Sequence, residues 1–110
     1  MAKRIEAVSY ELKTGCGDLH VLVNFKGKDI VRIIPVMGKA GGCASAQLSA
    51  IGGILTLAFK EKIDCERIVK VLGGIYCMNT MGIGDDKVTS CSDAIAQAIK
   101  LFMEEKKGLT

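Results

Sequence analysis

Four of the five cysteines in this chain of 110 residues lie where a predicted strand or helix begins or ends. They are Cys16, Cys43, Cys77 and Cys91. A buried structural cysteine usually lies inside an apolar run, whereas thiols at the ends of elements can approach one another in space. Four converging thiolates form the tetrahedral ligand set that binds zinc. The chemistry that these residues suggest is therefore metal binding.

The expected surroundings of these cysteines favour the thiolate form that a metal requires. Cys43 and Cys91 are expected at or just before the first turn of a helix, where free N–H groups and the helix dipole stabilise negative charge. Cys16 and Cys77 are expected in turns near glycine, where backbone N–H groups can point at sulfur. Only the deprotonated thiol binds a metal, and these groups offset its charge.

The spacing of the cysteines leaves two other interpretations open. The chain has no C-x-x-C pair, and the gaps between the four cysteines are long and uneven. Four separate buried thiols are one alternative, and a redox-active pair at helix ends is the other. The fifth cysteine, Cys65, falls on the apolar stripe of a predicted helix, so we expect it to be a small core residue.

The composition predicts a single domain over residues 1–110, located in a reducing compartment. Hydrophobic residues make up 49% of the chain, which is enough for a core, and a net charge of +3 is too small to argue for nucleic-acid binding. No apolar run approaches the ~18 residues of a membrane span, and no apolar segment of a signal peptide follows the first residues. Five cysteines without a secretion signal favour the cytoplasm.

Alternation of apolar and polar residues predicts three strands that form an antiparallel meander. They cover residues 5–12, 19–25 and 30–37, and residues 26–29 have the composition of a hairpin turn. Pro35, the only proline, has no N–H group to donate to a neighbouring strand. It is therefore expected on an edge strand or at the end of its strand.

A glycine-rich loop at residues 38–42 precedes three segments whose apolar residues recur at helical spacing. These segments start near residue 44, after residue 64 and after residue 90 or 92, and they are the expected helices. The predicted fold class is therefore α+β. We expect a three-stranded meander followed by about three helices packed on one face, with the four-cysteine site at the element ends.

Local signals predict where the helices end and where they pack. Asp64 is the expected N-cap of the second helix, and the pair Gly73-Gly74 is expected to stop it. Gly52 and Gly53 interrupt the first helix, and close packing of that helix on the sheet would explain them. The third helix is expected to begin at a serine N-cap, and residues 104–110 are expected to be a frayed tail.

The remaining polar residues do not form a set that points to catalysis. The only histidine, His20, falls on the outer face of a predicted strand, and the serines have no histidine nearby in the sequence. The loop at residues 38–42 has neither the P-loop spacing nor the G-x-G-x-x-G pattern, so a strand-to-helix turn is favoured over a phosphate site. We expect no enzymatic activity of the chain alone.

Four motifs together resemble one family, the TSCPD domain, which is named for its Thr-Ser-Cys-Pro-Asp motif. In this chain they are Thr14-Gly15-Cys16-Gly17, Gly38-Lys39-Ala40-Gly41-Gly42-Cys43-Ala44, Gly74-Ile75-Tyr76-Cys77 and Thr89-Ser90-Cys91-Ser92-Asp93-Ala94-Ile95-Ala96. They occur in the order of the family, over a match from about Tyr10 to Ala98. Ser92 stands where the family name has proline, and serine can cap the helix in its place.

The resemblance implies a ligand set and a role. Carried over by position, it implies that Cys16, Cys43, Cys77 and Cys91 hold a metal ion, which would be zinc, with iron or an Fe–S cluster as the alternative. The domain forms the C-terminal part of many adenosylcobalamin-dependent (class II) ribonucleotide reductases and also occurs as a short standalone protein. The catalytic barrel of such a reductase needs several hundred residues, so this chain would be an accessory piece.

Three functions stay open at the level of the sequence. The first is a zinc-stabilised accessory module that binds a partner, either a protein such as a ribonucleotide reductase or a nucleic acid. The second is a thiol redox carrier for a ribonucleotide reductase. The third is a nucleic-acid or nucleotide-binding module that uses the Lys39 loop, although the chain has few aromatic side chains for stacking. No membrane partner is expected, and the oligomeric state is open, a homodimer included.

Overall fold

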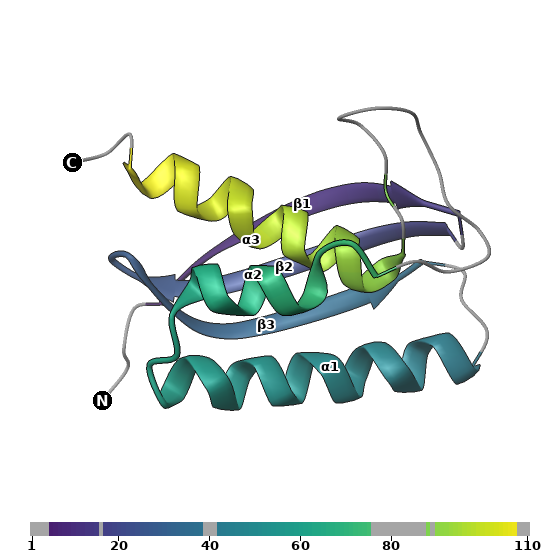
Figure 1. The fold of residues 1–110 in the computed structure, drawn as a ribbon, viewed down its shortest axis with the longest axis horizontal. Coiled ribbons are helices and arrows are strands. Elements are labelled where there is room, and N and C mark those ends of the chain that lie inside the picture. The colour runs from purple at the N-terminus through teal and green to yellow at the C-terminus, as the bar shows by residue number, and fades with distance from the viewer. Residues whose placement is uncertain (1–4, 16, 39–41, 76–87, 89, 108–110) are drawn as a thin grey trace.

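The computed structural model describes residues 5–15, 17–38, 42–75, 88 and 90–107 of the chain. In this part of the chain three strands are followed by three helices (Figure 1). Their bounds are β1 Glu6–Thr14, β2 Gly17–Lys26, β3 Asp29–Met37, α1 Gly42–Lys60, α2 Cys65–Leu72 and α3 Cys91–Lys107. This arrangement confirms the predicted α+β class.

The three strands form one antiparallel sheet in the order β1-β2-β3, as a meander requires. Side chains alternate between the two faces of a strand, so one face of the sheet can be buried and the other exposed. On β2 the inward residues Leu19, Val21 and Val23 are fully buried, while on β1 the outward residues Ser9 and Glu11 are exposed. The period of two in the sequence therefore predicts the buried face correctly.

Helix α1 lies against the edge strand β3 and covers part of its free edge. The backbone N–H of Ile33 donates a hydrogen bond to Thr56 Oγ1 on the helix, at 3.2 Å. Gly52 makes this approach possible, because a Cβ atom there would lie 2.7 Å from Pro35 Cδ and 3.1 Å from the Ile33 carbonyl oxygen. Pro35 is on an edge strand, as predicted. A covered edge is protected from pairing with another chain.

Helix α3 supplies the centre of the core and packs against β1 and β2. Its residue Phe102 is 1% exposed and meets Phe25 of β2 edge to face, with 5.1 Å between ring centroids. Lys106 Nζ lies 3.8 Å from the centroid of the Phe25 ring. These contacts hold the last turns of the helix, so the predicted fraying is wrong for residues 104–107, which are helical. Residues 108–110 lie outside the described part of the chain.

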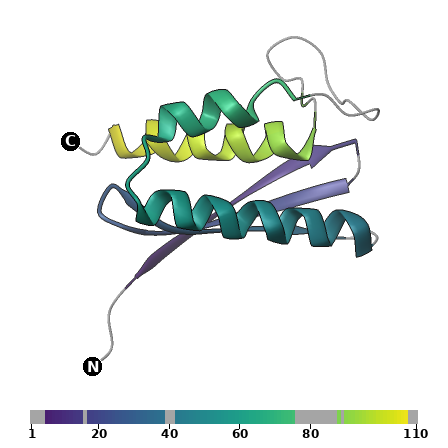
Figure 2. The same cartoon turned by 60° about the horizontal axis from the view of Figure 1, so that its bottom comes forward.

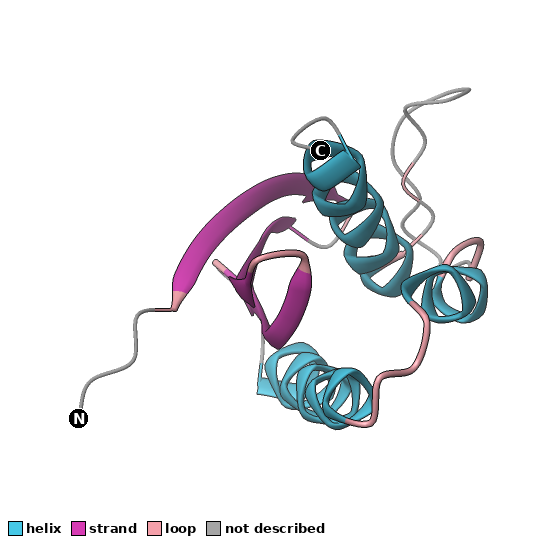
Figure 3. Cartoon of the chain, turned by 90° about the vertical axis from the view of Figure 1, so that its left-hand side faces the viewer, coloured by secondary structure: helices cyan, strands magenta, loops and turns pink. Residues whose placement is uncertain are grey.

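The short helix α2 packs on α3 rather than on the sheet, and both helices lie on the same side of the curved sheet as α1 (Figure 3). Its N-cap Asp64 accepts a hydrogen bond from the backbone N–H of Glu66 at 3.2 Å. At the other end, the N–H of Gly73 donates to the carbonyl oxygen of Val69 at 2.8 Å. Both predicted ends of this helix are confirmed.

Some boundaries differ from the predictions. Strand β1 continues to Thr14, and α1 begins at Gly42, about two residues earlier than expected. The strand is longer because the Thr14 hydroxyl donates to the Gly17 carbonyl oxygen at 2.8 Å and closes the hairpin between β1 and β2. Among the helices of the described residues, none combines the length and apolarity that crossing a bilayer demands.

The two adjacent glycines of α1 provide a matched test of its packing. A Cβ atom added at Gly53 would meet open space, whereas one added at Gly52 would meet Pro35 and the Ile33 carbonyl oxygen. We expect Gly52→Ala to lower the free energy of unfolding by about 1–3 kcal/mol, because the overpacking outweighs the gain in helix propensity. Gly53→Ala is expected to raise it by up to about 1 kcal/mol.

Urea denaturation of the two variants beside the unsubstituted protein measures both effects. Equal stabilisation by the two alanines would show that α1 does not approach β3 as closely as described.

Candidate metal centre

The segments that carry the four cysteines all start from one end of the molecule. In Figure 1 the end of β1, the start of β2, the end of β3 and the starts of α1 and α3 lie toward the same end of the long axis, and α2 runs in the direction of that end. The hairpin register agrees, since Thr14 pairs with Gly17 and Leu19 pairs with Met37. Described residues that flank the four cysteines in sequence therefore lie toward one end of the molecule.

Cys91 is the one predicted ligand whose side chain the structure describes. It is the first residue of α3, is half-buried, and places its Sγ 4.0 Å from Thr14 Oγ1 at the end of β1. Thr14 itself is 4% exposed. Cys16 follows Thr14 by two residues, so the contact brings the start of α3 to the turn that carries Cys16.

The start of α3 also favours a thiolate at Cys91. Ser90 Oγ accepts a hydrogen bond from the backbone N–H of Asp93 at 3.1 Å, which makes Ser90 the N-cap and confirms one of the two predicted caps. The N-terminus of a helix of this length carries partial positive charge. Negative charge on the Cys91 sulfur is stabilised there, which is the requirement for binding a metal.

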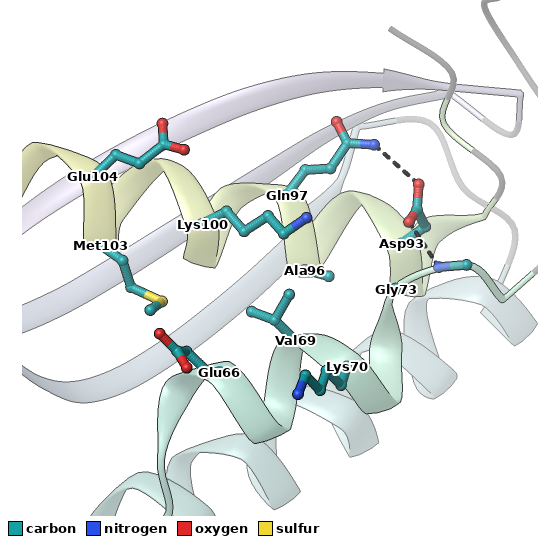
Figure 4. A pocket seen from close by; sticks show the side chains of 11 residues that line it. Glu66, Val69, Lys70, Gly73, Asp93, Ala96, Gln97, Lys100, Met103 and Glu104 are labelled. Atoms are coloured by element: carbon teal, nitrogen blue, oxygen red, sulfur yellow. Dashed lines mark hydrogen bonds between the residues drawn. The ribbon is translucent and has the colours of Figure 1, made fainter. Parts of the chain in front are cut away.

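Asp93 connects the start of α3 to the end of α2. Its Oδ1 accepts a hydrogen bond from the backbone N–H of Gly74 at 2.9 Å, and its Oδ2 accepts one from Gln97 Nε2 at 2.9 Å (Figure 4). Asp93 is 9% exposed. Cys77 comes three residues after Gly74, so this carboxylate holds the segment leading to Cys77 beside the helix that begins with Cys91.

The fourth segment starts from the end of β3. The backbone N–H of Gly38 donates to the Asp18 carbonyl oxygen at 3.1 Å, which ties the exit of β3 to the beginning of β2. Cys43 is the second residue of α1, so its backbone lies in the first helical turn, as expected. The first turn again offers free N–H groups to a thiolate.

The convergence of all four sulfur atoms stays a prediction. Cys16 and Cys77 lie outside the described residues, and only the backbone of Cys43 is described. Within the described residues no group of three or more histidine, cysteine, aspartate or glutamate side chains could hold a metal. Cys91 alone of the four can be placed by its side chain.

The fifth cysteine is placed differently. Cys65 is half-buried and packs against the core, as its position on an apolar stripe predicts. Burial raises the pKa of its thiol, and the nearby Asp64 carboxylate raises it further. The surroundings of Cys65 therefore favour the protonated thiol rather than the thiolate.

A cleft of about 600 Å³ opens between α2 and α3, next to Asp93 (Figure 4). Its charged side chains comprise three acidic residues, Glu66, Asp93 and Glu104, and two basic residues, Lys70 and Lys100. Asp93 already accepts hydrogen bonds from Gly74 and Gln97, and the other four charges balance, so the cleft does not strongly favour an ion of either sign.

Sequence reasoning missed two residues that organise this end of the molecule. Asp93 was part of a motif, but its link to Gly74 had no local signal. Thr14 was part of a motif, but its burial and its hydrogen bond to Gly17 were not expected.

Comparison with protein families gives one match, which covers residues 2–103 and is described as the TSCPD domain. No curated protein and no solved structure matches the chain.

The link between α2 and α3 can be tested by substituting Asp93. Asp93→Ala removes two hydrogen bonds to a charged acceptor, so we expect a loss of about 2–3 kcal/mol in the free energy of unfolding. Gln97→Ala removes the second bond, leaves the first in place and is expected to cost about 1 kcal/mol. Asp93→Asn keeps an acceptor for Gly74 and should recover part of the loss. Chemical denaturation measures all three, and equal losses for Asp93→Ala and Gln97→Ala would contradict the link.

The raised pKa of Cys65 predicts how its alkylation depends on pH. In the folded protein its rate of reaction with iodoacetamide should keep rising at pH values where an ordinary cysteine has levelled off, because only the thiolate reacts. Peptide mass spectrometry separates Cys65 from the other thiols, and the urea-unfolded chain provides the reference. Identical pH profiles in the folded and unfolded chains would contradict the assignment.

Proposed function

This chain belongs to the TSCPD domain family, and from that premise we propose that it is a small metal-binding accessory module without catalysis of its own. The proposed ligands are Cys16, Cys43, Cys77 and Cys91. The proposed metal is zinc, and iron or an Fe–S cluster is the alternative for four thiolates. The proposed place of work is the cytoplasm, where thiols stay reduced.

The observation that supports this proposal best is that the ends of β1 and α2 contact the start of α3, where Cys91 lies. Its sulfur lies 4.0 Å from Thr14 Oγ1, and the Asp93 carboxylate, two residues further on, binds the backbone of Gly74. Two described contacts thus draw the segments leading to Cys16 and Cys77 toward Cys91. Two of the four ligands would also sit in the first turn of a helix, which stabilises thiolates.

The proposed set of four thiolate ligands is typical of a structural metal site rather than a catalytic one. Four thiolates fill the coordination sphere of zinc and leave no open position for a substrate or an activated water. Bound there, the metal would cross-link the ends of strands and helices at one end of the domain. Such an ion adds its binding free energy to folding, because the unfolded chain holds no preformed site.

The partner that we propose is a protein, and the resemblance suggests its class. Domains of this family occur at the C-terminus of cobalamin-dependent ribonucleotide reductases. A standalone copy of such a domain would act as an accessory piece that assists the synthesis of deoxyribonucleotides.

Metal analysis of protein purified without oxygen tests the proposed site. We expect about one zinc ion per chain, and serine in place of any one of the four proposed ligands should reduce the metal content strongly and lower the Tm by roughly 10 °C or more. Cys65→Ser is the matched control and should keep the metal. The visible spectrum separates colourless zinc from coloured iron. A folded protein that contains neither metal would refute the proposal.

A thiol redox carrier is the second candidate, and the position of Cys91 at the start of α3 favours it, because a stabilised thiolate also serves in disulfide exchange. Thiol titration distinguishes the two functions. A carrier shows two reactive thiols and a reversible disulfide, whereas the thiols of a zinc site stay masked until a chelator is added.

A further inference from the structure

An apolar groove of about 440 Å³ lies between α1 and α2. The two helices run side by side (Figure 2), but α1 packs on β3 and α2 packs on α3. At the floor of the groove Leu55 and Ile68 are buried in the core, while the outer residues of both helices stay exposed in the described part of the chain. The groove is lined by aliphatic residues and a single arginine: Ile51, Ile54, Leu55, Ala58, Ile63, Arg67, Ile68, Val71 and Leu72.

Large aliphatic side chains on this groove are strongly exposed. Val71 is 73% exposed, Ile54 is 68% exposed and Ile63 is 43% exposed. Leu57, one turn from Ile54 on the same helix, is 61% exposed. Single exposed apolar residues are ordinary on a protein surface, but a contiguous patch of them marks a site of interaction.

The charge of this surface restricts what can bind it. Helix α1 has no charged residue between Gly42 and Phe59, and Arg67 is the one charged residue that lines the groove. Arg67 forms no ion pair with any described residue. A complementary partner therefore offers an apolar surface and a carboxylate that can reach the guanidinium.

The size of the surface favours a single helix over a second copy of the chain. Two helices of 19 and 8 residues, at about 1.5 Å per residue and about 10 Å in width, present at most on the order of 400 Å². A stable dimer buries about 800 Å² on each partner, which is roughly twice as much. One amphipathic helix laid into a groove matches the smaller area.

We propose that the groove between α1 and α2 is a docking site for an amphipathic helix of a partner protein. The partner helix carries aliphatic anchors at i, i+3, i+4 and i+7, and a carboxylate on the next turn that pairs with Arg67. The proposal deepens the accessory role proposed above and rests on it only in assuming that the chain works through a protein partner. It does not depend on the metal, because its test changes only residues that are not proposed ligands.

Two synthetic peptides of about 16 residues test the groove with the full-length protein. Both carry leucine at i, i+3, i+4 and i+7, and their other residues are alanine and glutamine. They differ at one position on the following turn of the same face, which is glutamate in one peptide and lysine in the other. Fluorescence anisotropy of the labelled peptides measures their affinities. We expect the glutamate peptide to bind roughly tenfold more tightly than the lysine peptide, because attraction to Arg67 replaces repulsion.

Variants of the protein then locate the binding. Arg67→Glu should reverse the preference between the two peptides, and Ile54→Lys or Val71→Lys should abolish the binding of both. Leu101→Lys is the matched control, since Leu101 is 42% exposed on α3 and does not line the groove, and it should change neither affinity. Circular dichroism verifies that each variant is folded.

Three results would overturn the proposal. The first is that neither peptide binds, and the second is that both bind equally well. The third is a dimer in sedimentation analysis that Ile54→Lys dissociates, because that result would assign the groove to a second copy of the chain. Metal content measured on the same samples distinguishes a failure of the groove proposal from a failure of the metal proposal. The groove variants leave all four proposed metal ligands in place, so they should not change the metal content.

Discussion

The carboxylate of Asp93 joins the start of α3 to the end of α2. It lies in the first turn of α3, accepts the N–H of Gly74 at the end of α2 and binds the amide of Gln97. A carboxylate suits this position because the helix N-terminus stabilises its charge. Through this one side chain, the start of the central helix is placed beside the segment that leads to Cys77. The proposed metal centre depends on that placement.

The packing of α1 has two consequences at different faces of the same helix. On one face, Gly52 lets the helix approach β3 so closely that Thr56 accepts the Ile33 N–H and covers the edge of the sheet. On another face, the apolar residue Ile54 lines a groove that α2 does not fill, because α2 packs on α3. The domain thus separates a proposed metal centre at the end of its elements from a proposed docking surface along its helices.

Most of the fold could be predicted, because its elements follow local rules. The period of two predicts which residues of β2 are buried, and Asp64 and Gly73 mark the ends of α2. The error at residues 104–107 has a tertiary cause, since those turns are held by the contact of Phe102 and Lys106 with Phe25 on a distant strand. For the site, the sequence indicates candidate ligands and predicts thiolate-favouring positions, and only Cys91 among them has a described side chain.

Local sequence patterns were sufficient to predict the order and type of the elements, the caps of α2 and α3 and the family, because these depend on residues that are neighbours along the chain. Which of two adjacent glycines touches a strand depends on tertiary packing, since Gly52 and Gly53 have the same local context. Tertiary packing also decided that the exposed residues Ile54 and Val71, which belong to two different helices, line one groove. These features depend on how elements that are distant in sequence pack against one another, and local sequence patterns do not predict such contacts.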